Sequence, residues 1–331
     1  MSTTAQNRDR YVALSGGVGG AKLSLGLAHL LGERLTVIVN TGDDFEHLGL
    51  HISPDVDTAI YTLAGVVNPD TGWGRRDETW TFMAALQGLG GPNWFKLGDA
   101  DLATHVERTR RLRSGETLTS ITAHLARSFG VKSRILPMSD EPLRTVVETD
   151  QGPLAFQDYF VREQCRPIVR AIRFDGTAAS KPSPQVEAAL ADPALAGIII
   201  CPSNPWLSVD PILAVPGLRD AIRANGAPVI AVSPIIAGRA VKGPTAKIMR
   251  ELDLEPNAVS IARHYAGLID GFVIDSEDRT LADAITIALR VTRTLMQSLD
   301  DKVALARDCL DFCAALRIAR GRDAKTAGVR A

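Results

Sequence analysis

The sequence predicts an α/β fold: a Rossmann-like, mostly parallel sheet with helices on both faces and an inserted helical and β subdomain. Short apolar runs rich in β-branched residues recur at 11–14, 35–39, 198–201, 228–232 and 272–274. None alternates apolar with polar residues, and each is followed by a turn rich in glycine, proline or serine and then by a helical pattern. Strands of this kind are buried on both faces, as in a parallel sheet between helices.

Composition narrows the class of protein and of partner. The 331 residues carry a formal net charge of −1 and are 45% hydrophobic, as in ordinary globular proteins. Without excess positive charge, we expect small-molecule substrates rather than nucleic acid, and no run approaches the eighteen apolar residues of a membrane span. Four scattered cysteines and a polar N-terminal stretch predict a cytoplasmic protein without disulfides.

The pattern divides the chain into a core and an insertion. We assign 1–69 and 176–318 to the Rossmann-like core and 70–175 to an inserted subdomain that closes over the ligand site. The insertion combines helical patterns at 77–86, 101–112 and 118–129 with β-like runs such as "SRILPM", "LRTVVET" and "GPLAFQDYFV". We expect two helices within 279–316 and a disordered tail at 319–331, where residues are small and basic.

A glycine-rich turn follows the first predicted strand, in "LSGGVGGAKLSLGLAHLL" at 14–31. Gly16, Gly17, Gly19 and Gly20 allow close backbone approach, and a helix starting near residue 21 would direct its N–H groups at an anion. The dinucleotide pattern GxGxxG is broken, because Lys22 stands where the third glycine should be. The turn alone is equally consistent with a phosphate site and with a plain tight turn.

Four aspartates follow the second predicted strand, in "VNTGDDFEHLGLHISPDVDT". Asp43, Asp44, Asp55 and Asp57 fall at a strand end and a helix start, where carboxylates can converge on a ligand. Magnesium takes one or two such carboxylates together with substrate phosphates. The alternative for Asp55 or Asp57 is to cap a helix that begins near residue 56, and the sequence does not say which of the four acids binds metal.

Two later strand-end loops add polar and cationic groups. Ser203 and Asn204 lie in "CPSNPWLSVDP", and Lys242, Gly243 and Lys247 lie in "SPIIAGRAVKGPTAKIM" at the entry to a helix. Either loop is also consistent with a plain connection between elements. Together with the glycine turn and the acids, they favour a site for a diphosphate and a metal.

Nine motifs occur in an order and spacing similar to those of a known family. They are "SGGVGGAK", "VNTGDD", "SPDVDTAIYTLAG", "GWG", "FKLGDADLATH", "ILPMSDEPLRT", "FQDYFV", "PSNPWLSVDPIL" and "SPIIAGRAVKGP". Between about 11 and 316 the chain resembles the 2-phospho-L-lactate transferase (CofD/FbiA) family of coenzyme F(420) biosynthesis. The resemblance implies a magnesium-dependent transferase with a Rossmann-like fold, often a homodimer.

The resemblance also implies a reaction. A phospholactyl or phosphoenolpyruvyl unit would move from a guanylated diphosphate, lactyl-2-diphospho-5'-guanosine or its enolpyruvyl analogue, to the ribityl hydroxyl of 7,8-didemethyl-8-hydroxy-5-deazariboflavin (Fo). GMP would leave. The sequence does not say which three-carbon acid the donor carries, because such groups differ by only ~1–3 kcal/mol in an apolar pocket.

Site residues follow from the same motifs. By resemblance, Asp43 and Asp55 bind magnesium, and Asp57 and Lys96 contact Fo. The walls of the phosphate and nucleotide site are then the glycine turn with Ser203, Asn204 and Pro205. As a mechanism, we expect Asp57 to orient the ribityl hydroxyl or accept its proton, and the sequence does not say whether a general base is needed. Charge on departing GMP would be offset by Lys22, Lys242 or Lys247.

Aromatic residues are concentrated in the predicted insertion. Trp73, Trp80, Trp94 and Phe95 suit a planar deazaflavin by stacking, although each is also consistent with core packing. We therefore expect the Fo pocket between the sheet edge and the insertion. The alternatives are a nucleotide-sugar-binding regulator of the gluconeogenesis-factor type, and an NAD-dependent oxidoreductase, which the broken GxGxxG disfavours.

Overall fold

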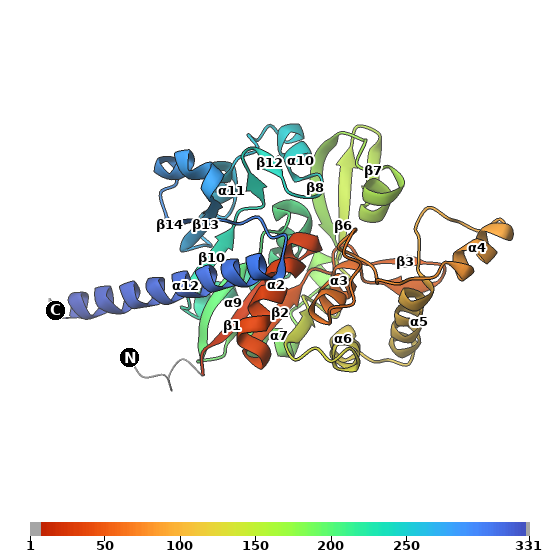
Figure 1. The fold of residues 1–331 in the computed structure, drawn as a ribbon, viewed down its shortest axis with the longest axis horizontal. Helices are drawn as coiled ribbons and strands as arrows, with labels where there is room; N and C mark the ends of the chain where they lie inside the picture. The colour runs from red at the N-terminus through yellow and green to blue at the C-terminus, as the bar shows by residue number, and fades with distance from the viewer. Residues whose placement is uncertain (1–7, 329–331) are drawn as a thin grey trace.

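The computed structural model describes residues 8–328, with the backbone alone for 321–328. Its centre is a sheet of seven parallel strands in the order β14-β13-β10-β9-β1-β2-β5 (Figure 1). The strands are β1 (Arg10–Ser15), β2 (Leu35–Val39), β5 (Arg134–Pro137), β9 (Leu195–Ile200), β10 (Val229–Val232), β13 (Gly271–Asp275) and β14 (Ala288–Thr292). Each of the five apolar runs forms a strand, so the prediction of a parallel sheet is confirmed.

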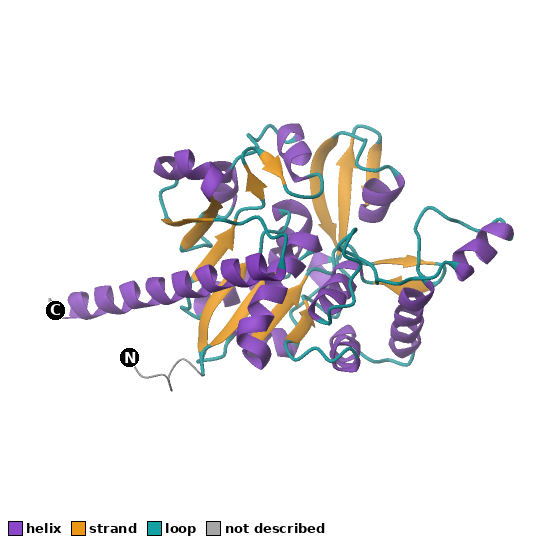
Figure 2. Cartoon of the chain, in the orientation of Figure 1, coloured by secondary structure: helices purple, strands orange, loops and turns teal. Residues whose placement is uncertain are grey.

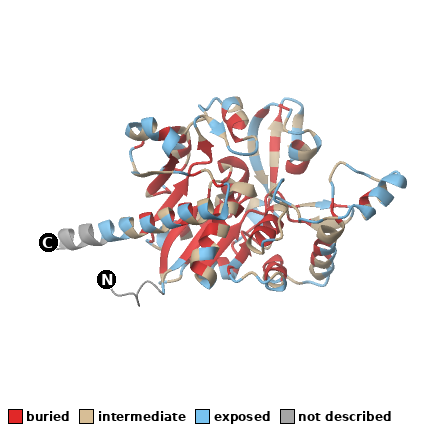
Figure 3. Cartoon of the chain, viewed as in Figure 1, coloured by how far each residue is buried: buried red, intermediate tan, exposed pale blue. Residues whose placement is uncertain are grey.

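Apolar side chains cover both faces of this sheet, which explains why the strands lack polar alternation. Along β1, Tyr11 and Ala13 belong to one buried cluster, and Val12 and Leu14 belong to the other. Successive side chains of a strand point to opposite faces, so the two clusters are the two sides of the sheet. Figure 3 shows the middle strands of the sheet mainly buried, whereas no residue of the edge strand β14 is buried.

Helices pack on both faces of the sheet (Figure 2). The cluster that contains Tyr11 includes side chains from α2 (Gly17–Leu31), α3 (Pro54–Leu63), α6 (Leu118–Ser128) and α12 (Leu299–Gly328). The other cluster includes side chains from α7 (Pro184–Leu190), α8 (Asp210–Ala214), α9 (Leu218–Ala224), α10 (Thr245–Glu251) and α11 (Ala258–His264). This three-layer arrangement is the predicted Rossmann-like α/β fold.

The strand order reverses direction once. From β1 the chain proceeds to β2 and β5 on one side, and then crosses to β9, β10, β13 and β14 on the other. β1 pairs in parallel with both β2 and β9, so the reversal lies between β1 and β9. Ligands of open α/β sheets bind in the crevice at such a point, beyond the carboxyl ends of the strands.

The segment predicted as one insertion has three destinations. α4 (Thr81–Gly88) and α5 (Asp99–Arg113) form an arm together with β3 (Phe45–His47) and β4 (Leu50–Ile52), which the sequence prediction assigned to the core. The arm has a small core of its own and lies far from the C-terminus (Figure 1). β5 joins the central sheet, where its apolar residues pair with β2, and so is not part of a separate subdomain. β6 (Arg144–Thr149), β7 (Gly152–Ala155) and β8 (Val169–Asp175) form an antiparallel sheet that packs on the core.

Three local predictions differ from the structure. The part of the "GPLAFQDYFV" run at Asp158–Arg162 is a π-helical turn, not a strand. The expected pair of helices in 279–316 is a 3₁₀ segment (Ser276–Ala284), the strand β14 and the helix α12. α12 continues to Gly328, so the expected disordered tail is not found at 319–328, and residues 329–331 lie outside the described part.

The remaining elements are short. β11 (Ile235–Ile236) and β12 (Arg239–Ala240) form a hairpin, and single 3₁₀ turns occupy Gly32–Arg34 and Thr177–Ala179. Among the described residues, no helix is long and apolar enough to cross a membrane.

Candidate active site

A cavity of about 610 Å³ lies beyond the carboxyl ends of β1 and β9, where the strand order reverses. Most of the predicted site residues line it: Gly16, Gly17, Gly19, Lys22, Asp43, Asp55, Asp57, Lys96, Ser203, Asn204, Lys242 and Gly243. Gly20 and Pro205 are not among the lining residues. Residues from distant parts of the chain therefore meet at the position that the topology favours.

The glycine turn is fitted to the loop after β9. The backbone N–H of Gly16 donates to Ser203 Oγ over 3.2 Å, and the Ser203 hydroxyl donates to the Gly16 carbonyl over 2.7 Å. A Cβ on Gly19 would lie 2.3 Å from the carbonyl oxygen of Pro202, and one on Gly20 would lie 2.5 Å from Ser203 Oγ. Gly20 thus packs under the site, while Gly19 also reaches the cavity.

The helix after β1 starts earlier than predicted. α2 begins at Gly17, which has φ +61°, rather than near residue 21. Its first turn, from Gly17 to Gly20, has no side-chain cap in the structure. The Gly17 N–H donates to Asp55 Oδ1, and the next N–H groups of this turn, which have no partner within the helix, lie beside the cavity in the geometry that suits an anion.

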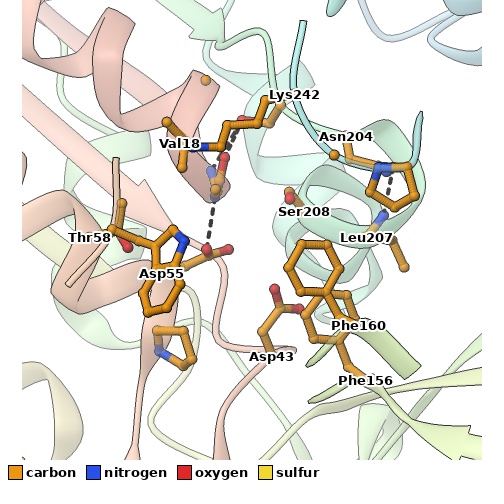
Figure 4. A pocket seen from close by; sticks show the side chains of 18 of the residues that line it. Val18, Asp43, Asp55, Thr58, Phe156, Phe160, Asn204, Leu207, Ser208 and Lys242 are labelled. Carbon is orange, nitrogen blue, oxygen red and sulfur yellow. Dashed lines mark hydrogen bonds between the residues drawn. The ribbon is translucent and has the colours of Figure 1, made fainter. Parts of the chain in front are cut away.

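Two buried carboxylates approach the cavity from different elements (Figure 4). Asp55, in the first turn of α3, accepts hydrogen bonds from the Gly17 N–H at 2.8 Å and from Asn40 Nδ2 at 2.9 Å. Burial raises its pKa to about 6 despite these bonds. Asp43 Oδ1 is buried without a hydrogen-bond partner among the described residues, and burial and the nearby Asp55 raise the Asp43 pKa well above its ordinary value.

Asp44 and Asp57, the other two acids, have different partners, and only Asp57 lines the cavity. Asp44 Oδ2 accepts from the Ser53 hydroxyl at 2.8 Å and lies 3.1 Å from His51 Nε2, and Asp44 does not line the cavity. Asp57 is buried and forms an ion pair with Arg108 through Oδ1, while Oδ2 has no hydrogen-bond partner in the described chain. Burial raises the Asp57 pKa, and the guanidinium of Arg108 opposes that shift.

Helix capping, the alternative for Asp55 and Asp57, does not describe either residue. α3 begins at Pro54, and its N-cap is Ser53, which makes no side-chain capping bond. Asp43 and Asp55 instead form a buried pair of like charges with one free oxygen. Such a donor set fits a hard divalent cation such as magnesium, which takes oxygen ligands.

The cations around the cavity differ from the sequence-based set. Lys22 and Lys242 line it, and burial, together with neighbouring lysines, lowers the pKa of Lys22. The Lys242 ammonium donates to the carbonyl of Thr71. Lys247 does not line the cavity and pairs with Glu251 at 2.6 Å on its own helix, so its predicted contact with the leaving group is not supported by its position.

Aromatic side chains form one wall. Trp94 and Phe95 line the cavity with their ring centroids 5.7 Å apart, and the guanidinium of Arg162 lies 4.4 Å from the centre of the Trp94 ring. Trp73 also reaches the cavity, whereas Trp80 is about half exposed and does not line it.

Several residues of the site were not predicted. Phe156 and Phe160 line the cavity with their rings stacked at 5.3 Å, and Figure 4 shows them beside Asp43. Asn40 directly follows β2, and a polar residue at the end of an apolar strand could have been predicted as part of the site. Arg108 lies inside the charged helix α5, and nothing local distinguishes it from its arginine neighbours.

Comparisons with known proteins agree with this geometry. The family model of 2-phospho-L-lactate transferase CofD matches residues 11–297. A phosphoenolpyruvate transferase of Kitasatospora aureofaciens is 40% identical over 319 residues, covering 93% of this chain and 99% of that protein. One from Mycobacterium ulcerans is 39% identical over 302 residues, covering 84% and 91%.

Among solved structures, a UPF0052-family protein of Bacillus halodurans has a TM-score of 0.63 at 15% identity, covering 91% of this chain and 98% of that one. This likeness supports the fold alone. The sequence relatives are named as transferases, which disfavours both the regulator and the oxidoreductase. The resemblance predicted from nine motifs is confirmed: the chain belongs to the 2-phospho-L-lactate transferase (CofD) family and is a transferase.

Proposed function

We propose that the protein transfers a phosphoenolpyruvyl unit from a guanylated diphosphate to the ribityl hydroxyl of Fo, releasing GMP, in coenzyme F(420) biosynthesis. The names of the relatives favour the enolpyruvyl donor over the lactyl donor. One observation carries the proposal: the glycine turn, the Asp43–Asp55 pair and the free oxygen of Asp57 line the same cavity. Homodimerisation and a cytoplasmic location stay predictions from the sequence.

The donor would lie against the glycine turn. The first N–H groups of α2 and the ammonium of Lys22 supply positive charge to its phosphates. Asp43 and Asp55 would hold magnesium, which supplies further positive charge to the diphosphate when it is bound. Asn204 adds a buried Nδ2 that has no partner in the described structure, and this N–H group can donate to a phosphate oxygen.

The acceptor would lie between Asp57 and the aromatic wall. Asp57 lines the cavity and its Oδ2 has no hydrogen-bond partner among the described residues, so Oδ2 can accept a hydrogen bond from the ribityl hydroxyl and then its proton. The hydroxyl oxygen forms a bond to the phosphorus of the phosphoenolpyruvyl unit, and the bond from that phosphorus to GMP breaks. Trp94 and Phe95 can stack on the planar deazaflavin, and Lys96 lies beside them.

The test is a reconstitution. The purified protein is incubated with Fo, magnesium chloride and either the enolpyruvyl or the lactyl guanylated diphosphate, and GMP and the Fo product are quantified. We expect equal amounts of GMP and product, both abolished by EDTA or by omission of Fo, and a preference for the enolpyruvyl donor in competition. GMP release that does not depend on Fo would contradict the acceptor, and turnover in EDTA would contradict the metal.

A further inference from the structure

A buried ion pair connects the arm to the core beside the cavity. Arg108 on α5 is fully buried, and its Nη2 contacts Oδ1 of Asp57 on α3, 51 residues away in sequence. α5 belongs to the arm, whereas α3 packs on the central sheet. The guanidinium therefore holds Asp57, a residue of α3, from a different helix, α5.

Nη1 of Arg108 is also engaged, whereas its Nε has no hydrogen-bond partner among the described residues. Nη1 donates to His105 Nδ1 at 3.2 Å and lies 3.4 Å from the backbone carbonyl of His51. Because Nδ1 accepts from Arg108, the ring hydrogen of neutral His105 is on Nε2, which lies 3.3 Å from Asp101 Oδ2. Arg108 thus holds one oxygen of Asp57 and the lone pair of His105. Asp57 Oδ2 lies 3.6 Å from His105 Nδ1 and has no hydrogen-bond partner among the described residues.

A metal ion is a weaker explanation of this cluster. Asp57, Asp101 and His105 offer ligand atoms within 4.8 Å of one another, which is metal-like spacing. The guanidinium of Arg108, however, already supplies the positive charge and uses both Asp57 Oδ1 and His105 Nδ1. A cation placed there would be repelled by a group that cannot lose its proton.

Stability alone is also a weak explanation. Replacing a buried ion pair with apolar groups is often neutral or stabilising, so such a pair is poor evidence of a stabilising role. Asp57 and His105 line the cavity, and Oδ2 is the oxygen of Asp57 that Arg108 leaves without a hydrogen bond among the described residues. The arrangement is what orientation of a single acceptor oxygen requires.

We propose that Arg108 is a positioning residue for the transfer reaction, acting through Asp57 by holding its Oδ1 so that Oδ2 faces the acceptor hydroxyl. This inference rests on the proposed function. It assigns Arg108 to the acceptor half of the reaction and not to the donor half. A general structural role would instead affect both substrates and the folded fraction together.

The test is a double-mutant cycle. Arg108→Met, Asp57→Asn and the double variant are compared by kcat, by KM for Fo and for the donor, and by thermal melting. We expect Arg108→Met to lower kcat/KM for Fo by about 100-fold, as for a misplaced catalytic group, with the donor KM unchanged. The double variant should be no slower than Asp57→Asn alone, because the arginine then has nothing to position.

Two further variants keep the test decisive. Arg108→Lys retains the charge but lacks the fork that reaches Asp57 and His105 together, so we expect activity between wild type and Arg108→Met. If Arg108→Met does not fold, the activity of Arg108→Lys provides the test instead. Arg111→Met is the matched control: Arg111 is on the same helix, pairs with Glu107 and Glu116 away from the cavity, and should leave both KM values unchanged.

The outcomes separate the two proposals. If the wild type does not turn over Fo, the proposed function fails. If the wild type is active but the losses of Arg108→Met and Asp57→Asn multiply in the double variant, or the donor KM rises as much as that for Fo, Arg108 does not act through Asp57 and the inference is overturned.

Discussion

Replacing Asp43 with asparagine should stabilise the metal-free protein and abolish its response to magnesium. Asp43 has a buried oxygen without a partner in the described structure, and its charge lies near that of Asp55. Asparagine keeps the shape of the side chain and removes the negative charge. The same change removes a proposed metal ligand, so the stability of the metal-free protein should rise while its magnesium-dependent activity falls.

The magnitude follows from the pKa values. The Asp55 pKa is raised from 3.8 to about 6, and at about 1.4 kcal/mol per pKa unit its ionisation costs the fold about 3 kcal/mol at neutral pH. The Asp43 pKa is raised in the same direction by burial and by the nearby Asp55, so the Asp55 figure serves as the scale for removing the Asp43 charge. A carboxyl whose pKa is raised on folding binds its proton more tightly in the folded state, so the free energy of unfolding falls as pH rises from the ordinary to the raised pKa.

The assay is chemical denaturation in EDTA across that pH range, repeated with magnesium. We expect the free energy of unfolding of Asp43→Asn to exceed that of the wild type by about 1–3 kcal/mol at neutral pH. The difference should be smaller near the ordinary carboxyl pKa. Magnesium should then stabilise the wild type alone, since only a bound ion shifts the folding equilibrium. Asp44→Asn is the control, and it should lose stability because Asp44 accepts hydrogen bonds from its neighbours.

If Asp43→Asn is less stable than the wild type in EDTA at neutral pH, the carboxylate is stabilised by the fold, and the reasoning is refuted. If magnesium stabilises this variant and the wild type equally, Asp43 is not a ligand.

Three further predictions concern the walls of the cavity. Gly19→Ala places a Cβ 2.3 Å from a carbonyl oxygen of the loop after β9, so we expect a stability loss of about 1–3 kcal/mol in thermal melting and a larger rise in KM for the donor than for Fo. Lys22→Met should raise the donor KM in steady-state kinetics, whereas Lys247→Met, outside the cavity, should not. Trp94→Ala should raise the KM for Fo about 10-fold through lost stacking, and Trp80→Ala, outside the cavity, should leave it unchanged.

The central sheet was predictable because its strands are buried on both faces. Continuous apolar runs then mark the strands directly, and the turns after them mark the ligand-binding edge. Asp43, Asp55 and Ser203 were found in this way, since each lies in a segment that follows a strand. The strand at 288–292 was missed because its residues are half-buried or exposed, and its sequence, ALRVT, is short.

Residues that the site takes from the arm were harder to find. Arg108 is one of several arginines on α5, and only the packing of the arm against α3 makes it fully buried. Phe156 and Phe160 stand in a run with a β-like pattern, but the chain is helical at 156–157 and π-helical at Asp158–Arg162, and the two stacked rings line the cavity. Long-range packing, which no local pattern encodes, decides these positions.

The first turn of α3 connects the two halves of the proposed reaction. Residues two apart on a helix face different directions, and Asp55 and Asp57 are two apart. Asp55 bonds to the glycine turn of the donor side, whereas Asp57 pairs with the arm on the acceptor side. In the proposed reaction one turn would therefore set the relative placement of the two substrates, and a shift of the arm alone would alter the orientation of Asp57 and leave Asp55 on the glycine turn.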